Sequence, residues 1–106
     1  MADVATTKLL ENDKIIIWDL VLEPGESTGM HTHELDYAIH IIEGSTLHAI
    51  DGDGSNPRDV PLKSGETHYF SVSDGVAMAG DLRTNATHDA KNIGPGRYRE
   101  IMVEIK

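Results

Sequence analysis

The sequence predicts an all-β protein, folded as a small sandwich or barrel. Two observations favour this class. The apolar segments are short, rich in β-branched residues and separated by turn residues at regular intervals, a pattern typical of sandwiches and barrels. No segment carries the long apolar stripe of an amphipathic helix, which repeats every 3.6 residues. The chain has 106 residues and no linker, repeat or low-complexity tract, so one domain over 1–106 is expected.

Six segments are expected to form strands, because they combine apolar residues with turn signals at both ends. In chain order they span 14–22, 30–33, 36–43, 45–51, 66–72 and 97–106. The bend at 43–44 is expected to join two paired strands. Residues 51–59 are expected to form a polar loop, and the N-terminal segment 1–13 is expected to hold one short helical turn within 3–13.

Composition excludes several classes of function. With 18 acidic and 9 basic residues the formal net charge is −9, which would repel a phosphate backbone, so no nucleic-acid partner is expected. The sequence has no cysteine, which excludes disulfides, iron–sulfur clusters and thiol catalysis. The start of the chain lacks the pattern of a secretory signal, and the apolar runs are too short to cross a membrane. A cytoplasmic protein without a membrane partner is therefore expected.

His31 and His33 indicate a metal site. They are two residues apart, so on an extended strand both side chains point to the same side. Histidine is the commonest metal ligand, and two imidazoles on one strand face supply neighbouring coordination positions. A Pro-Gly turn precedes the pair, and an apolar strand that ends in glycine follows it.

This stretch resembles the first motif of the cupin superfamily, G-x5-H-x-H-x3,4-E-x6-G. Gly25, His31, His33 and Gly44 match the motif, and Tyr37 stands where the motif has its glutamate. The sequence H-T-H-E-x-D-Y also resembles that of small single-domain cupins, the monocupins, that are associated with β-alanine degradation.

The second cupin motif is similar to a later part of the chain. Residues 65–77 resemble its beginning, residues 88–92 resemble its end, and residues 78–87 are expected to be an inserted loop between them. The resemblance covers residues 14–105. It implies an antiparallel β-barrel of the jelly-roll type, often a homodimer, with a divalent metal ion held by His31, His33 and His88.

Tyr37 at the position of the glutamate leaves the fourth ligand open. Glu34 follows His33 directly and is expected to point to the opposite side of the strand. Asp36 has suitable chemistry, but it would need a bulge to reach inward. Tyr37 itself is a further alternative. In the favoured arrangement nothing replaces the glutamate. Three neutral imidazoles then hold the metal and leave open coordination positions, as in the thiol dioxygenases of this superfamily.

Two residues are candidates for catalysis beside the metal. His68 shares a strand side with Phe70 and is expected to face the interior, where it would line the cavity or serve as a reserve ligand if the 78–87 loop kept His88 away. Tyr37 is expected to face inward and could donate its hydroxyl to a bound molecule. His40 and His48 are expected to be structural.

These residues lead to one functional hypothesis and two alternatives. The hypothesis is an iron(II) dioxygenase-type oxidoreductase that acts on a small carboxylate-bearing molecule, with Tyr37 or His68 moving a proton or orienting the substrate. The first alternative is a cupin that binds a small ligand without chemistry. The second is an isomerase or lyase with zinc or nickel as a Lewis acid, since imidazole suits all three metals.

Overall fold

The computed structural model describes residues 2–106, which form eleven β-strands and no helix. The strands are β1 (Thr7–Glu11), β2 (Ile15–Leu22), β3 (His31–Thr32), β4 (Asp36–Glu43), β5 (Ser45–Asp51), β6 (Arg58–Leu62), β7 (Thr67–Ser73), β8 (Val76–Ala79), β9 (Leu82–Asn85), β10 (Thr87–Asn92) and β11 (Tyr98–Ile105). Residue 1, which belongs to the expected domain 1–106 and its N-terminal segment, lies outside the described residues. Over 2–106 the structure has no helix long and apolar enough to cross a membrane.

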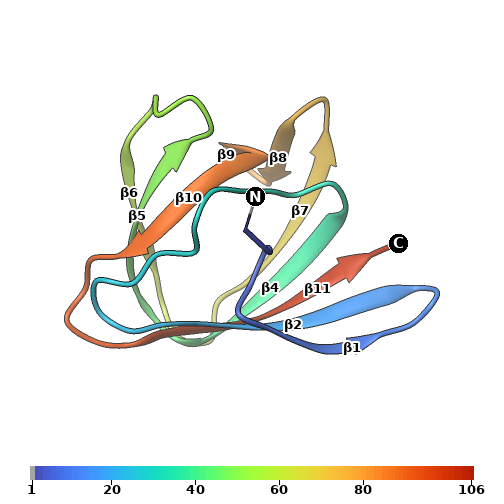
Figure 1. Ribbon diagram of the computed structural model, residues 1–106, viewed down its shortest axis with the longest axis horizontal. Coiled ribbons are helices and arrows are strands. Elements are labelled where there is room, and N and C mark those ends of the chain that lie inside the picture. The colour runs from blue at the N-terminus through green and yellow to red at the C-terminus, as the bar shows by residue number, and fades with distance from the viewer. Residues whose placement is uncertain (1) are drawn as a thin grey trace.

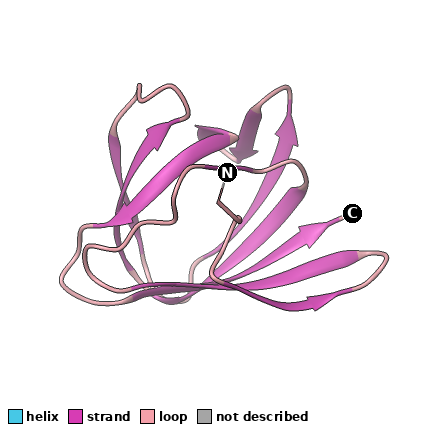
Figure 2. Cartoon of the chain, in the orientation of Figure 1, coloured by secondary structure: helices cyan, strands magenta, loops and turns pink. Residues whose placement is uncertain are grey.

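Two antiparallel sheets face each other (Figures 1 and 2). The larger sheet has seven strands in the order β1-β2-β11-β4-β7-β8-β9, and the smaller has four in the order β3-β10-β5-β6. In Figure 1 the smaller sheet lies on the left and the larger one runs along the bottom and right. The expectation of an all-β fold with antiparallel sheets is confirmed.

The core lies between the sheets and follows the strand alternation. Alternate residues of a strand point to one face, and on β2, β4 and β11 every second residue is buried. The inward residues of these strands are Trp18, Leu20, Leu22, Tyr37, Ile39, Ile41, Tyr98 and Met102, with Phe70 joining them from β7. Two glutamates, Glu100 and Glu104, also occupy inward positions on β11. The sequence pattern therefore sets which faces meet.

All six predicted strands are present. Strands β4 and β5 have the predicted bounds, β2 differs from its prediction by one residue at its start, and β3, β7 and β11 differ by one residue at each end. The predicted loop over 51–59 is wrong at its end, because β6 begins at Arg58 and pairs with β5. Pro61 is tolerated in β6 because that strand lies at the edge of its sheet.

Two local predictions are wrong. The short helical turn expected within 3–13 is absent, since Thr7–Glu11 pair with β2 as strand β1. All five residues of β1 are exposed, so their side chains carry no inward pattern and the backbone ladder alone defines the strand. The bend at 43–44 does not join paired strands, because β4 and β5 belong to different sheets.

Gly44 marks the crossing between the sheets. A Cβ atom at this position would lie 2.5 Å from the carbonyl oxygen of Leu62 and 2.6 Å from the backbone nitrogen of Ser64. Both distances are shorter than van der Waals contact, so only glycine lets the chain pass this close to the segment after β6. The close approach brings the two sheets together at this end of the barrel.

Residues 78–87, expected as an inserted loop, lie mostly in the hairpin of β8 and β9. Met78 pairs with Arg83 and Ala79 with Leu82, and Gly80 has a φ of 58° in the tight turn between them. The hairpin ends at Ala86, whose nitrogen donates to the carbonyl of Gly75 at 2.8 Å. The segment is thus tied to the sheet at its base.

Candidate metal centre

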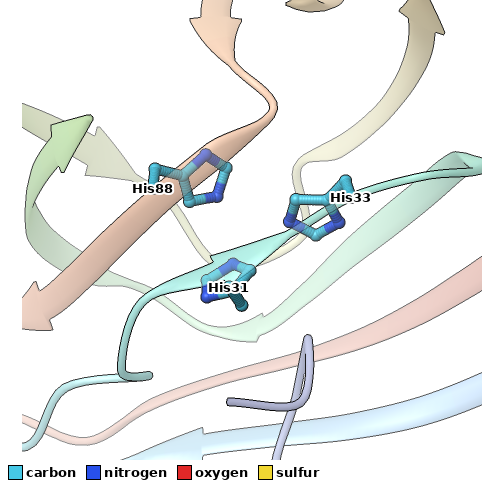
Figure 3. Close-up of side chains that lie close together, drawn as sticks. All are labelled: His31, His33 and His88. Carbon is cyan, nitrogen blue, oxygen red and sulfur yellow. The ribbon is translucent and has the colours of Figure 1, made fainter. Parts of the chain in front are cut away.

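Three histidines come together from two elements of the smaller sheet (Figure 3). His31 lies on β3, His33 directly follows β3, and His88 lies on β10. Strand pairing places His31 opposite His88, and the His33 nitrogen donates to the carbonyl of Ala86 at 2.8 Å. One ring nitrogen from each histidine lies within 4.8 Å of the others, a spacing that a single metal ion could bridge.

Hydrogen bonds orient two of the imidazoles. Nδ1 of His31 lies 2.8 Å from the carbonyl oxygen of Gly29, and Nδ1 of His88 lies 2.6 Å from that of Asn85. A carbonyl only accepts, so each Nδ1 carries the proton and each Nε2 is left with a free lone pair. Nδ1 of His33 is buried without a hydrogen-bond partner among the described residues. This donor set fits a divalent metal ion.

The burial of the three rings keeps them neutral. His31 and His33 are buried, and His88 is partly buried. Desolvation, with repulsion from His88 and His31, lowers the pKa of His33 to about 2. Desolvation likewise lowers the pKa of His88 to about 4, and it lowers that of His31 against the opposing hydrogen bond to Gly29. Neutral imidazole is the form that binds metal.

Tyr37 packs directly on the cluster. Its ring stacks on His33 at 4.1 Å between centroids and, on the other side, on Phe70 at 4.8 Å. Burial raises the pKa of the Tyr37 hydroxyl above its usual range, so the phenol stays protonated at neutral pH. At the position of the motif's glutamate, the protein therefore places an aromatic ring against His33 instead of a carboxylate.

The acidic alternatives lie elsewhere. Asp36 accepts hydrogen bonds from the Val72 nitrogen at 2.8 Å and from the Tyr69 hydroxyl at 3.3 Å, and Glu34 is exposed. Over residues 2–106 the clustered ligands are the three histidines, without a carboxylate. The geometry therefore has the form of a three-imidazole site with open positions.

The remaining histidines lie outside the cluster. His68 is on β7, its Nε2 is 3.6 Å from Oε2 of Glu66, and it is not part of the cavity wall described below. His40 hydrogen-bonds the hydroxyl of Thr67 at 2.7 Å. His48 hydrogen-bonds a carboxylate oxygen of Asp59 at 2.8 Å, a partner that could not be named from the sequence.

A cavity of about 370 Å³ lies beside the cluster. This volume is at the lower end of the range for small-molecule sites. Besides the three histidines and Tyr37, its wall is mostly apolar, with Leu20, Ile39, Leu47, Val60, Phe70 and Met102 among its residues. The cavity therefore favours a compact, mostly apolar molecule next to the histidines.

Among the polar residues of this wall that sequence reasoning missed are Arg58 and Glu100. Arg58 donates to Asp51 at 3.0 Å, and Asp51 pairs with His88 across β5 and β10, so the guanidinium lies near the cluster. No local signal marks it, because its place beside the cluster depends on the pairing of β5 with β10 and on a contact with the distant Thr84. Glu100 carried one signal: the alternation in 97–106 places it on the same side as the apolar Met102.

Glu100 is a buried acid in this apolar wall. Its exposed fraction is 5%, and its Oε1 accepts a hydrogen bond from the hydroxyl of Tyr98 at 2.7 Å. Oε2 is buried and has no hydrogen-bond partner within residues 2–106. Desolvation raises the pKa of Glu100 to about 7, although the Tyr98 hydrogen bond acts in the opposite direction.

Comparison by sequence finds no relative: no protein-family model matches the chain, and no curated protein is similar to it. Solved structures do resemble it. A cupin domain from Bordetella pertussis Tohama I has a TM-score of 0.73 at 19% identity, over 94% of this chain and 90% of that one. An RmlC-like cupin with a double-stranded β-helix from Methanocaldococcus jannaschii has a TM-score of 0.63 at 19% identity, over 92% and 75%.

A third similar structure has a stated activity. It is a polyketide cyclase from Streptomyces resistomycificus, with a TM-score of 0.57 at 19% identity, over 92% of this chain and 61% of that one. Identities at this level establish shared architecture and leave activity open. With its two facing antiparallel sheets and these neighbours, the chain has the cupin fold, the double-stranded β-helix.

Proposed function

We propose that the protein is a metal-dependent oxidoreductase of the dioxygenase type, acting on a small carboxylate-bearing molecule. In this proposal His31, His33 and His88 hold one divalent ion, with iron(II) favoured over zinc or nickel. The observation that carries the proposal is the convergence of three neutral imidazoles without a carboxylate. When bound, iron(II) would supply a Lewis acid and a one-electron redox centre.

The absence of a carboxylate in the ligand set favours an anionic substrate. Neutral imidazoles would not compensate the positive charge of a divalent ion, so the carboxylate of a substrate would supply the missing negative charge. Arg58 adds a guanidinium to the same part of the cavity wall and has the fork geometry that matches a carboxylate. Its pairing with Asp51 holds the guanidinium in place.

Tyr37 is the residue proposed to orient the substrate. Its ring is held between His33 and Phe70, so its position is fixed by stacking on both faces. The phenol retains its proton and can donate a hydrogen bond to a bound molecule. The apolar wall around it limits the access of water. His68 receives no role, because it lies outside this wall.

Metal analysis tests the proposal directly. The full-length chain, without a polyhistidine tag, would be purified without chelator and analysed for iron, zinc and nickel. We expect about one iron per chain, lost in His31→Ala/His33→Ala and in His88→Ala. The matched control is His40→Ala: His40 is exposed and hydrogen-bonds Thr67 away from the cluster, so this variant should retain the metal.

The outcomes separate the alternatives. Iron that depends on the three histidines, followed by oxygen consumption with members of a panel of small carboxylates, would support the proposal. Zinc or nickel at a similar level would contradict the redox part and favour an isomerase or lyase. A wild-type protein that takes up none of the three metals, even on supplementation, would contradict the metal centre and leave a ligand-binding barrel.

A further inference from the structure

The carboxyl of Glu100 has hydrogen-bonding capacity that the protein does not use. Tyr98 satisfies Oε1, whereas Oε2 has no partner among the described residues. Buried polar atoms are nearly always paired, and a missing partner calls for an explanation such as a water or a ligand. Because Glu100 forms part of the cavity wall, a molecule in the cavity is in a position to provide that partner.

Within residues 2–106, no cationic side chain forms a hydrogen bond or ion pair with Glu100. Its neighbours across the strands are Ile41 on β4 and Leu20 on β2, both apolar. The Tyr98 hydroxyl is the one side-chain group that hydrogen-bonds it within residues 2–106. A buried carboxyl in such surroundings is matched by a neutral polar partner better than by a charged one.

Glu100 and the histidines mark different parts of the cavity. Tyr37, which stacks on His33, and Ile41, which pairs with Glu100, are four residues apart on β4. Four residues of an extended strand span roughly 13 Å. Along the paired backbones of β4 and β11, the apolar pair Ile39 and Met102 lies between the position of Glu100 and that of Tyr37, so Glu100 is a polar contact separate from the proposed metal ligands.

We propose that the Glu100 carboxyl binds a hydroxyl group of the ligand. The cavity would then take a mostly apolar molecule with a carboxylate near the histidines and an alcohol or phenol hydroxyl toward Glu100. A hydroxyl both donates and accepts, so it can pair with the carboxyl in its protonated and its ionised form. The assignment of the carboxylate rests on the proposed function, whereas the assignment of the hydroxyl does not.

A matched pair of probes tests the hydroxyl contact. Toluene and p-cresol have similar shapes, and p-cresol adds one hydroxyl. Their dissociation constants would be measured by NMR titration of the full-length protein, first as purified and then with chelator. We expect Glu100→Leu to weaken p-cresol binding about tenfold relative to toluene binding. Glu100→Gln keeps a carbonyl acceptor and should keep p-cresol binding within about threefold of the wild type.

Glu104→Gln is the control, since Glu104 is buried on the same face of β11 but bonds the Trp18 indole at 2.6 Å and lies outside the cavity wall. This control should leave the ratio of the p-cresol and toluene dissociation constants unchanged. An unchanged ratio in Glu100→Leu would overturn the proposal, and so would failure of both probes to bind. A hydroxyl preference that disappears with chelator would assign the hydroxyl to the metal and also overturn it. Because the effect is expected with chelator present, its failure is distinct from failure of the metal centre.

Discussion

Replacement of Glu100 by glutamine should change how the stability of the protein depends on pH. The folded state raises the pKa of Glu100 from an ordinary value of 4.5 to about 7, chiefly by desolvation. The folded state therefore holds this proton more tightly than the unfolded chain. The resulting contribution to stability is fully present below the unfolded pKa and is lost as the pH rises through the folded pKa.

The size of the effect follows from the same shift. One pKa unit corresponds to about 1.4 kcal/mol, so the wild type should lose roughly 2–3 kcal/mol of unfolding free energy between about pH 5 and about pH 8 through Glu100. Glu100→Gln has no titrating group here and should lack this loss. The lowered pKa values of the three histidines act in the opposite direction, but both proteins share them, so they cancel in the comparison.

The assay is urea unfolding at both pH values, with chelator present and followed by fluorescence. Trp18 is the single tryptophan and is buried, so its emission reports on the folded core. Tyr98→Phe removes the hydrogen bond that lowers the pKa of Glu100, and it should enlarge the loss at alkaline pH. Glu104→Gln leaves Glu100 in place and should retain the loss. An equal change with pH in wild type and Glu100→Gln would refute the reasoning.

Three further predictions concern the site and the assembly. Tyr37→Glu restores the carboxylate of the first motif and should tighten zinc binding at least about tenfold in competition with a chelating dye, whereas Tyr37→Phe keeps the ring stack and should leave zinc affinity unchanged. The metal-free protein should lose stability as the pH falls below about 6.5, because His33 and His88 are protonated in the unfolded chain but stay neutral in the folded state. Urea unfolding as a function of pH would show this loss, and His33→Gln/His88→Gln should reduce the dependence of the unfolding free energy on pH. The outer face of the larger sheet exposes Ile42 and Tyr69, so we expect a homodimer by sedimentation equilibrium and a monomer for Ile42→Glu/Tyr69→Glu; a monomeric wild type would contradict the expectation.

The strands that the sequence predicts well have alternation that matches burial. In β4, Tyr37, Ile39 and Ile41 are buried and their neighbours are less so, which is the pattern visible in the letters alone. Strand β1 has no such pattern because its residues are all exposed, and pairing with β2 defines it. The partner of each strand was harder to predict, since the bend at Gly44 passes between sheets instead of forming a hairpin.

The residues of the candidate site likewise divide into those that the sequence predicts and those that only the fold reveals. His31 and His33 are visible from their spacing, and His88 from its motif, so the three-histidine cluster could be anticipated. Arg58 could not, because it joins the site through Asp51 and the hydroxyl of Thr84, and Thr84 is distant in sequence. Recognising Glu100 required knowing which side of β11 faces inward, and the half-polar alternation of that strand does not settle this.

The β8–β9 hairpin shapes part of the cavity wall, whereas other elements supply the proposed metal ligands. Leu82, Arg83 and Thr84 of this hairpin form part of the wall, whereas the histidines come from β3, the residue after it, and β10. In sequence the hairpin interrupts a motif, yet in space it is one side of the compartment. Changes at the tip of the hairpin would reshape the compartment, while Asn85 and Ala86 at its base would still hydrogen-bond His88 and His33 and keep these ligands in place. New specificities could therefore be grafted onto this barrel by replacing a single contiguous segment.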